Sequence, residues 1–150
     1  MSVEGAFEAL IERDVRFGYL DRSVPGVHQL HPRVVVNRAD TSMLRVLRDE
    51  LRHCESFAFS VAFVSPRAIA LLKQEFVESR AKGLIVTSDY LGFNSPAAFA
   101  ELLNLSRLGV DVRIHESHAY HPKGYVFGHR DRIAAVLGSS NLTEGALVTN

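Results

Sequence analysis

A histidine and a lysine separated by one residue, His121 and Lys123, are the side chains best suited to chemistry in this sequence. An imidazole is a competent nucleophile or general acid near neutral pH, and a lysine supplies positive charge for the non-bridging oxygens of a phosphate. Side chains two residues apart on a strand project from the same face. We therefore expect His121 and Lys123 to contact one phosphate together.

The polar segment Gly138-Ser139-Ser140-Asn141 forms a second motif, at the end of an apolar stretch. Glycine permits a sharp turn, and the hydroxyl and amide groups then precede the expected start of a helix. A strand-to-helix turn of this kind can bind an oxyanion. Structural interpretations exist as well: Asn141 could be a helix N-cap with Glu144 completing a capping box, and Ser139 and Ser140 could be turn residues.

The elements that must position these residues can be predicted from periodicity and turn signals. A strand-helix-strand-helix-strand order favours a parallel sheet, and two further strands joined by a polar turn at 128–131 predict a hairpin. The predicted fold class is therefore α/β, with a mixed, largely parallel sheet flanked by helices. The predicted strands are 57–64, 83–88, 110–114, 123–127 and 133–137, and the predicted helices are 3–15, 41–53 (capped by Thr41 or Asp40), 66–76 and 96–105, with a loop at 18–32.

The predicted hairpin connects the two motifs in space. Because its strands are neighbours, the end of the second strand lies beside the start of the first. This arrangement would bring Ser139 and Asn141 close to His121 and Lys123, so that the two motifs form one site.

Composition limits the class of protein without naming a function. The 150 residues, 47% of them hydrophobic and 23% charged, fit one domain covering 1–150. Seventeen acidic and seventeen basic residues give zero net charge, so any polyanion must be held locally. The sequence contains no apolar run that could span a membrane and no signal peptide, which predicts a cytoplasmic protein without membrane contacts. The single cysteine, Cys54, is expected to be a half-buried apolar residue.

The paired motif, His121-x-Lys123 followed by a strand pair and Gly138-Ser139-x-Asn141, resembles the signature of the phospholipase D superfamily. The resemblance begins near residue 35 and implies a phospholipase D-like fold and phosphodiester cleavage that needs no metal or cofactor. Three segments, 59–63, 87–91 and 139–143, more narrowly resemble the nuclease-like domain at the front of bacterial helicase-related proteins. This narrower resemblance implies DNA as substrate and fusion to a helicase. Because the sequence stops just after a predicted helix start, we expect it to be truncated at the C-terminus of a longer protein.

The superfamily resemblance also implies roles for the motif residues. Two such motifs face each other in that superfamily, one histidine attacking phosphorus to form a phosphohistidine while the other protonates the leaving oxygen. His121 would thus be nucleophile or acid, Lys123 and Asn141 would hold phosphoryl oxygens, and Ser139 and Ser140 would bind substrate. Two histidines at one phosphate need opposite protonation states, so their titrations should be coupled. Since the chain carries one complete motif, the resemblance implies a homodimer.

The sequence departs from the superfamily pattern in its acidic residues. The common form has an aspartate five residues after the lysine, where this sequence has Gly128. Asp131 falls in the predicted turn, and Glu144 stands three residues after Asn141. The acid that orients His121 is therefore not identified by the sequence.

The sequence also leaves three alternatives to a metal-independent nuclease. A catalytically inactive module that binds DNA or a partner protein for an attached helicase is favoured by the neutral charge and the missing acid. Lipid phosphodiester transfer is disfavoured because no membrane-binding segment is present. A zinc site at His115, His118 and His121 is disfavoured because strand residues three apart point to opposite faces.

Overall fold

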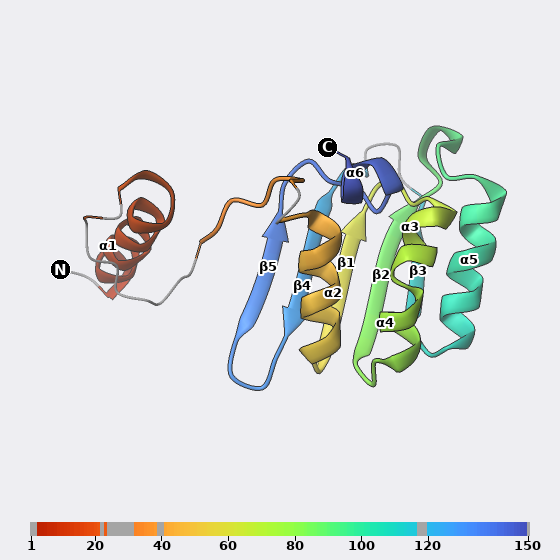
Figure 1. The fold of residues 1–150 in the computed structure, drawn as a ribbon, viewed down its shortest axis with the longest axis horizontal. Helices are drawn as coiled ribbons and strands as arrows, with labels where there is room; N and C mark the ends of the chain where they lie inside the picture. Colours follow the sequence, from red (N-terminus) through yellow and green to blue (C-terminus); the bar gives the residue numbers. More distant parts are fainter. Residues whose placement is uncertain (1–2, 22, 24–31, 39–40, 117–119, 150) are drawn as a thin grey trace. The chain divides into compact units, whose positions relative to one another are not determined.

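The computed structural model of the protein describes residues 3–21, 23, 32–38, 41–116 and 120–149 (Figure 1). The chain forms two compact units, Met1–Val35 and Val36–Asn150. In the first unit, α1 (Val3–Val15) confirms the predicted helix and is followed by a π-helical turn, η1 (Arg16–Leu20), where the sequence predicted a loop from residue 18. The five strands of the sheet and the five candidate site residues belong to the second unit. Asp40, His118 and residues 22 and 24–31 of the predicted loop lie outside the described residues.

The second unit is built on one five-stranded sheet with the order β3-β2-β1-β4-β5. The pairs β1–β2 and β2–β3 are parallel, whereas β1–β4 and β4–β5 are antiparallel. The predicted α/β class and mixed sheet are confirmed, but the prediction of a largely parallel sheet is wrong. The strands are β1 (Ser56–Val61), β2 (Lys82–Ser88), β3 (Asp111–His115), β4 (Lys123–Gly128) and β5 (Ile133–Leu137).

The short hairpin turn between β4 and β5 makes that pair antiparallel, and the connection from β3 to β4 explains the antiparallel pairing of β4 with β1. The β3–β4 connection starts and ends at the same edge of the sheet and spans 116–122, which is too short for the helical crossover that a parallel strand requires. The hydroxyl of Tyr120 lies 2.8 Å from Ser60 Oγ and donates a hydrogen bond of 3.3 Å to the carbonyl oxygen of Val86. Tyr120 therefore holds this connection across β1 and β2, and β4 enters beside β1 in the opposite direction.

The helices of the second unit begin at small polar caps. Ser42 caps α2, its Oγ accepting a 3.2 Å hydrogen bond from the Arg45 amide, in place of the predicted Thr41. Ser65 and Ser95 cap α3 and α5, each followed by a proline in the first turn. The predicted helix 66–76 is broken at Leu72 into two pieces. The helices are α2 (Met43–His53), α3 (Pro66–Leu71), α4 (Lys73–Glu78), α5 (Pro96–Arg107) and α6 (Glu144–Val148), with a 3-10 turn, η2 (Tyr90–Gly92).

The core lies between these helices and one face of the sheet. Figure 1 shows α2, α3 and α4 in front of the strands. Alternate residues of β1 and β4 point into this layer, and the Phe59 ring meets the Tyr125 ring edge-on at 5.0 Å. Phe57, Val61 and Phe127 are also buried there. On the opposite face of the sheet the side chains of Val126, Ile133 and Leu137 are exposed. One sheet face is therefore covered, and the other presents apolar surface.

A cluster of polar side chains around the buried Glu50 carboxylate lies at the turn between β4 and β5. Glu50 of α2 is 8% exposed, and its Oε2 lies 2.6 Å from His129 Nε2 and accepts a 2.9 Å hydrogen bond from Arg132 Nη2. A buried carboxylate is tolerated when it is paired in this way. The cluster fixes the β4–β5 hairpin against α2.

Leu142 provides a test of how the loop after β5 is anchored. It is fully buried, and its amide donates a 3.1 Å hydrogen bond to the Phe63 carbonyl oxygen. Because a buried leucine leaves a cavity when it is truncated, Leu142→Ala should lower the free energy of unfolding by about 2–5 kcal/mol in urea titrations. Leu103→Ala, at a 53% exposed leucine of α5, should change it by less than about 0.5 kcal/mol. Equal losses in the two variants would contradict this packing.

Candidate active site

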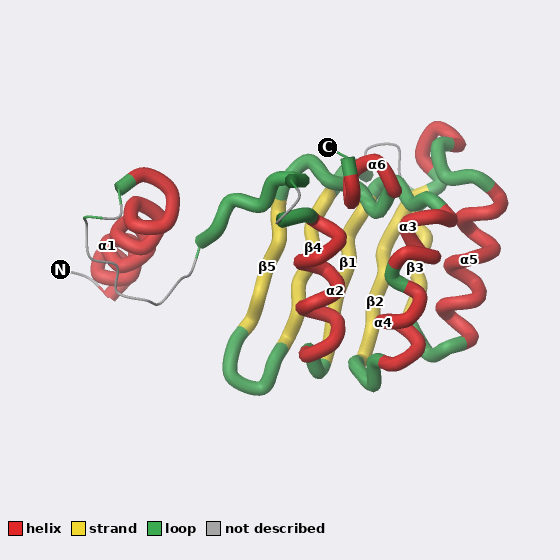
Figure 2. The backbone as a smooth tube through the Cα atoms, in the orientation of Figure 1, coloured by secondary structure: helices red, strands yellow, loops and turns green. Residues whose placement is uncertain are grey.

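The candidate residues gather at one edge of the sheet. Lys123 is the first residue of β4 and pairs with Val61, the last residue of β1. The strands β1, β2, β3 and β5 all end at this edge, and Figure 2 shows the connecting loops gathered there. We call it the carboxyl edge. In open α/β sheets, ligands bind outside the carboxyl ends of the strands. The edge is therefore the expected location for a site in this fold.

His121 and Lys123 are in direct contact. The ammonium nitrogen of Lys123 lies 2.8 Å from His121 Nδ1 and 3.2 Å from Nε2, and it donates a 3.1 Å hydrogen bond to the His121 carbonyl oxygen. The imidazole is exposed and Lys123 is half-buried. A lysine ammonium has N–H donors and no acceptor, so the imidazole nitrogen is the acceptor in this contact.

Asn141 reaches the same edge through Phe63. Its side-chain oxygen accepts a 3.2 Å hydrogen bond from the Phe63 backbone amide. The Phe63 ring in turn packs edge-on against the His121 ring, with centroids 5.4 Å apart. Because the side-chain oxygen of Asn141 is occupied, its amide nitrogen is the end that can donate to an anion.

The interpretation of Asn141 as a helix N-cap is wrong. Helix α6 begins at Glu144, and its N-cap residue is Thr143. The Glu144 amide donates a 3.1 Å hydrogen bond to Ser65 Oγ, and the Glu144 carboxylate pairs with Arg67 at 3.2 Å. Glu144 therefore stabilises the junction between α6 and α3.

The serine turn lies beside Lys123. The amide of Gly138 donates a 3.4 Å hydrogen bond to the Lys123 carbonyl oxygen. Ser139 is exposed, and Ser140 is half-buried with its carbonyl oxygen accepting a 2.9 Å hydrogen bond from the Tyr125 hydroxyl. Burial raises the pKa of Tyr125, so its phenol remains a hydrogen-bond donor at neutral pH. Tyr125 thereby orients the turn that carries both serines.

A buried asparagine joins the loops beneath the site. Asn94 is 5% exposed, and its Oδ1 accepts a 2.7 Å hydrogen bond from the Val64 amide. Its Nδ2 lies 2.7 Å from the Ser88 carbonyl oxygen, 3.1 Å from the Ala62 carbonyl oxygen and 3.2 Å from Thr87 Oγ1. Asn94 therefore links the loop after β1 to the end of β2.

The position of the missing aspartate is far from His121. Gly128 is the last residue of β4, at the opposite edge of the sheet, five strand residues or about 17 Å from Lys123. A Cβ atom at Gly128 would lie 2.6 Å from Ser56 Oγ. Asp131 is exposed in the turn at that same edge. Neither position can place a carboxylate against His121.

Within the described ranges, no group of three or more histidine, cysteine or acidic side chains is arranged to hold a metal ion. His115 contacts the Tyr120 ring, with centroids 4.6 Å apart, while His121 contacts Lys123. In the same part of the chain, no helix is both long enough and apolar enough to cross a membrane.

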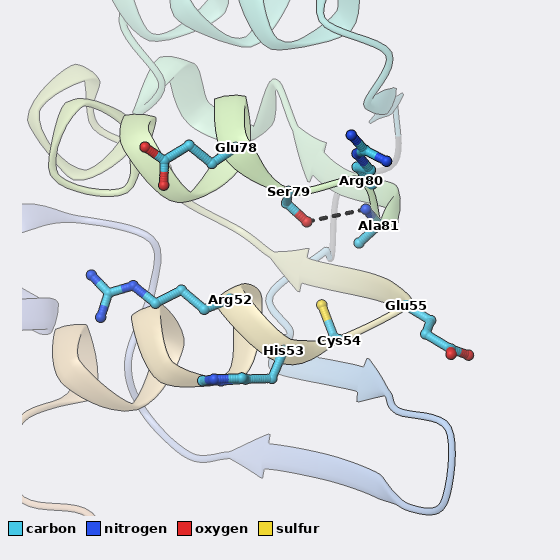
Figure 3. Close-up of a pocket in the computed structure, with 8 residues that line it drawn as sticks. All are labelled: Arg52, His53, Cys54, Glu55, Glu78, Ser79, Arg80 and Ala81. Atoms are coloured by element: carbon cyan, nitrogen blue, oxygen red, sulfur yellow. Dashed lines mark hydrogen bonds between the residues drawn. The ribbon is translucent and has the colours of Figure 1, made fainter.

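A shallow pocket at the opposite edge lacks a comparable set of reactive groups (Figure 3). Burial raises the pKa of the Cys54 thiol, which disfavours the nucleophilic thiolate. Arg52 is bound to Glu75 at 2.7 Å. The candidate residues are absent from the pocket lining, which consists of Arg52, His53, Cys54, Glu55, Glu78, Ser79, Arg80 and Ala81.

In comparisons with known proteins, no family model and no curated protein sequence matches this chain. The assignment of the candidate site therefore rests on the residues and the geometry described above. Two residues that sequence reasoning did not assign to the site, Phe63 and Asn94, prove to connect its loops. The signal for Phe63 was its place at the end of a strand beside the Ser65-Pro66 helix start.

Asn94→Asp tests the loop junction with a change of one atom. The introduced carboxyl would face the Ala62 and Ser88 carbonyl oxygens, so the free energy of unfolding at pH 7 should fall by about 1–3 kcal/mol. Burial among acceptors favours the protonated carboxyl, which restores a donor, so the deficit relative to the natural protein should shrink as the pH falls toward about 4.

The matched control is Asn104→Asp, at an exposed position of α5. It should change stability by less than about 0.5 kcal/mol over the same pH range. A pH-independent deficit in Asn94→Asp would argue against the donor role of Asn94.

Proposed function

We propose that this chain is a phosphodiesterase domain that cleaves DNA without a metal ion, through a phosphohistidine on His121. The observation that carries the proposal is the direct contact between the Lys123 ammonium and the His121 imidazole at the carboxyl edge. The phospholipase D resemblance of the motif supports the same chemistry. A phosphate entering this edge would meet a nucleophile and a positive charge together.

The proposed reaction consists of two displacements at phosphorus. The neutral imidazole of His121 attacks phosphorus, a P–N bond forms, and the P–O bond to the leaving group breaks. The leaving oxygen takes a proton from the partner subunit's His121. Water then attacks the phosphohistidine and returns a proton to that histidine, and the P–N bond breaks. Lys123 and the amide nitrogen of Asn141 stabilise the charge on the phosphoryl oxygens, with the hydroxyls of Ser139 and Ser140 assisting.

Metal-independent cleavage is the direct test. The protein should cut a labelled oligonucleotide in excess chelator, and His121→Ala and Lys123→Ala should each lower the rate by at least about a hundredfold. Acid-labile label should be trapped on the natural protein and be absent from His121→Ala. Full activity in either variant would refute the proposal.

Matched controls lie at the opposite edge of the sheet. His53 is exposed at the end of α2, and Lys82 is exposed at the start of β2. His53→Ala and Lys82→Ala should cleave at the natural rate. Thermal unfolding of all four variants should separate loss of chemistry from loss of fold.

The reaction requires a second histidine, which we propose comes from a second copy of this chain. The sheet face opposite α2, α3 and α4 offers apolar surface for such a contact through the side chains of Val126, Ile133 and Leu137, the last two 77% and 78% exposed. Leu137 directly precedes the serine turn. Packing two such faces about a two-fold axis parallel to the strands would bring the two carboxyl edges together, with the sheets about 10 Å apart.

The dimer can be tested through this face. Leu137→Lys and Ile133→Lys should shift the protein to a monomer in sedimentation experiments and lower activity per chain, because a buried unpaired lysine opposes association. Leu103→Lys on α5 is the control and should leave both properties unchanged. Full activity of a protein that sediments as a monomer would contradict the shared site.

A non-cleaving module attached to a helicase is the second candidate function. One observation favours it: the contacts described for the His121 ring are with Lys123 and Phe63, and neither residue is a carboxylate that could orient an imidazole. Salt-dependent DNA binding with no turnover and no trapped phosphohistidine would decide for this module.

A further inference from the structure

An exposed aromatic ring stands beside the candidate site. The Phe93 ring packs edge-on against the Phe63 ring at a centroid distance of 5.0 Å, and the Phe63 ring packs against the His121 ring at 5.4 Å. Phe93 is nevertheless 63% exposed, unlike the core rings of Phe57 and Phe59. Its outward surface therefore lies two ring-to-ring contacts away from the proposed nucleophile.

The backbone holds this ring in place from both sides. On one side, Gly92 adopts a φ of +65°, a left-handed conformation that glycine accepts readily, and the Phe93 amide donates a 3.3 Å hydrogen bond to the Tyr90 carbonyl oxygen. On the other side is Asn94, with its side chain buried and hydrogen-bonded to Val64 after β1 and to Ser88 at the end of β2. The supporting Phe63 is fixed by the hydrogen bond to Asn141. An exposed hydrophobic ring on a rigid support is suited to contact a flat apolar ligand.

We propose that Phe93 is a stacking platform for an unpaired nucleobase next to the phosphodiester at His121 and Lys123, so that the preferred substrate is single-stranded DNA. This inference rests on the proposed function, which places the phosphodiester at His121 and Lys123. It adds that the DNA strand is unpaired. Aromatic side chains stack on bases without sequence preference, and a base inside a duplex already has both faces covered. A lipid phosphodiester offers no such ring.

The neutral charge of the chain is consistent with stacking as a source of affinity. Nucleic-acid binding that depends on phosphate contacts alone weakens steeply with salt. Base stacking contributes affinity without neutralising a phosphate. Phe93 would thus supply a part of the binding that Lys123 cannot.

Tryptophan fluorescence can test stacking apart from cleavage. The sequence contains no tryptophan, so Phe93→Trp introduces a single reporter. In a His121→Ala background, which removes the proposed nucleophile, a single-stranded oligodeoxynucleotide should quench the fluorescence saturably. An abasic oligomer of the same length and the corresponding duplex should quench much less. The control is Leu108→Trp, at a 53% exposed residue after α5 at the opposite edge, which no DNA should quench.

Kinetics give an independent readout in the otherwise natural protein. Phe93→Ala should raise KM for the single-stranded oligonucleotide about tenfold with little change in kcat, because one stacking contact is lost. Phe93→Trp should keep the natural KM, and the abasic substrate should show the same KM with the natural protein and with Phe93→Ala.

The two proposals fail in different ways. Cleavage by the natural protein without quenching of Phe93→Trp, or with an unchanged KM in Phe93→Ala, would overturn the stacking inference and leave the phosphodiesterase standing. Base-dependent quenching without cleavage by the natural protein would support stacking and reject the phosphodiesterase. Equal quenching by base-bearing and abasic strands would also overturn stacking.

Discussion

The backbone of Ala62, where β1 ends, is the junction on which the carboxyl edge depends. Its carbonyl oxygen lies beyond the strand ladder and accepts hydrogen bonds from Thr87 Oγ1 at 3.2 Å, from Asn94 Nδ2 at 3.1 Å and from Ser88 Oγ at 3.4 Å. Its amide donates a 3.0 Å hydrogen bond to the carbonyl oxygen of Pro122. Since a buried backbone group without a partner is costly, these contacts fix the loop after β1 to β2 on one side and to the His-Pro-Lys segment on the other. The positions of His121 and Lys123 therefore depend on how the backbone amide and carbonyl groups of this one residue are satisfied at the end of the sheet.

Different kinds of interaction hold the two edges of the sheet: ion pairs at one, and neutral hydrogen bonds with ring contacts at the other. At the opposite edge, the buried carboxylates of Glu50 and Glu75 pair with Arg132 and Arg52, and Glu50 also contacts His129, so these arginines are already engaged by acidic side chains. At the carboxyl edge, neutral hydrogen bonds and ring contacts hold the backbone, which leaves the His121 imidazole exposed and the Lys123 ammonium bound only to that histidine among the described contacts. This division explains why zero net charge is compatible with a local anion site: many basic residues neutralise carboxylates elsewhere.

The parts of the structure that could be predicted are those set by local pattern. Apolar runs, alternation and turn signals located all five strands and the β4–β5 hairpin. Strand parity predicted that His121 and Lys123 would face one phosphate together, whereas in the structure their side chains contact each other and β4 begins at Lys123, after His121. Sheet order could not be predicted in this way, because the pairing of β4 with β1 involves non-local contacts, among them the hydrogen bonds of Tyr120 with Ser60 and Val86. The role of Asn94 was equally hidden, since an asparagine before a serine and a proline is typical of a loop, and its four partners lie after β1 and at the end of β2. Local sequence indicated which residues could react, and tertiary hydrogen bonds determine what holds them.

A site that combined only one cation, Lys123, and one exposed aromatic ring, Phe93, would bind DNA weakly by itself. A lysine that neutralises one phosphate adds little affinity at physiological salt, and a single stacked base contributes about 1–3 kcal/mol. The lysine and the aromatic ring together would bind a free single strand weakly and without preference for its base sequence. A site of this kind becomes effective when a linked module raises the local concentration of the strand, since tethering can provide millimolar effective concentrations. Fusion to a helicase, which exposes unpaired bases beside the domain, would supply both the concentration and the single-stranded form that the Phe93 surface requires.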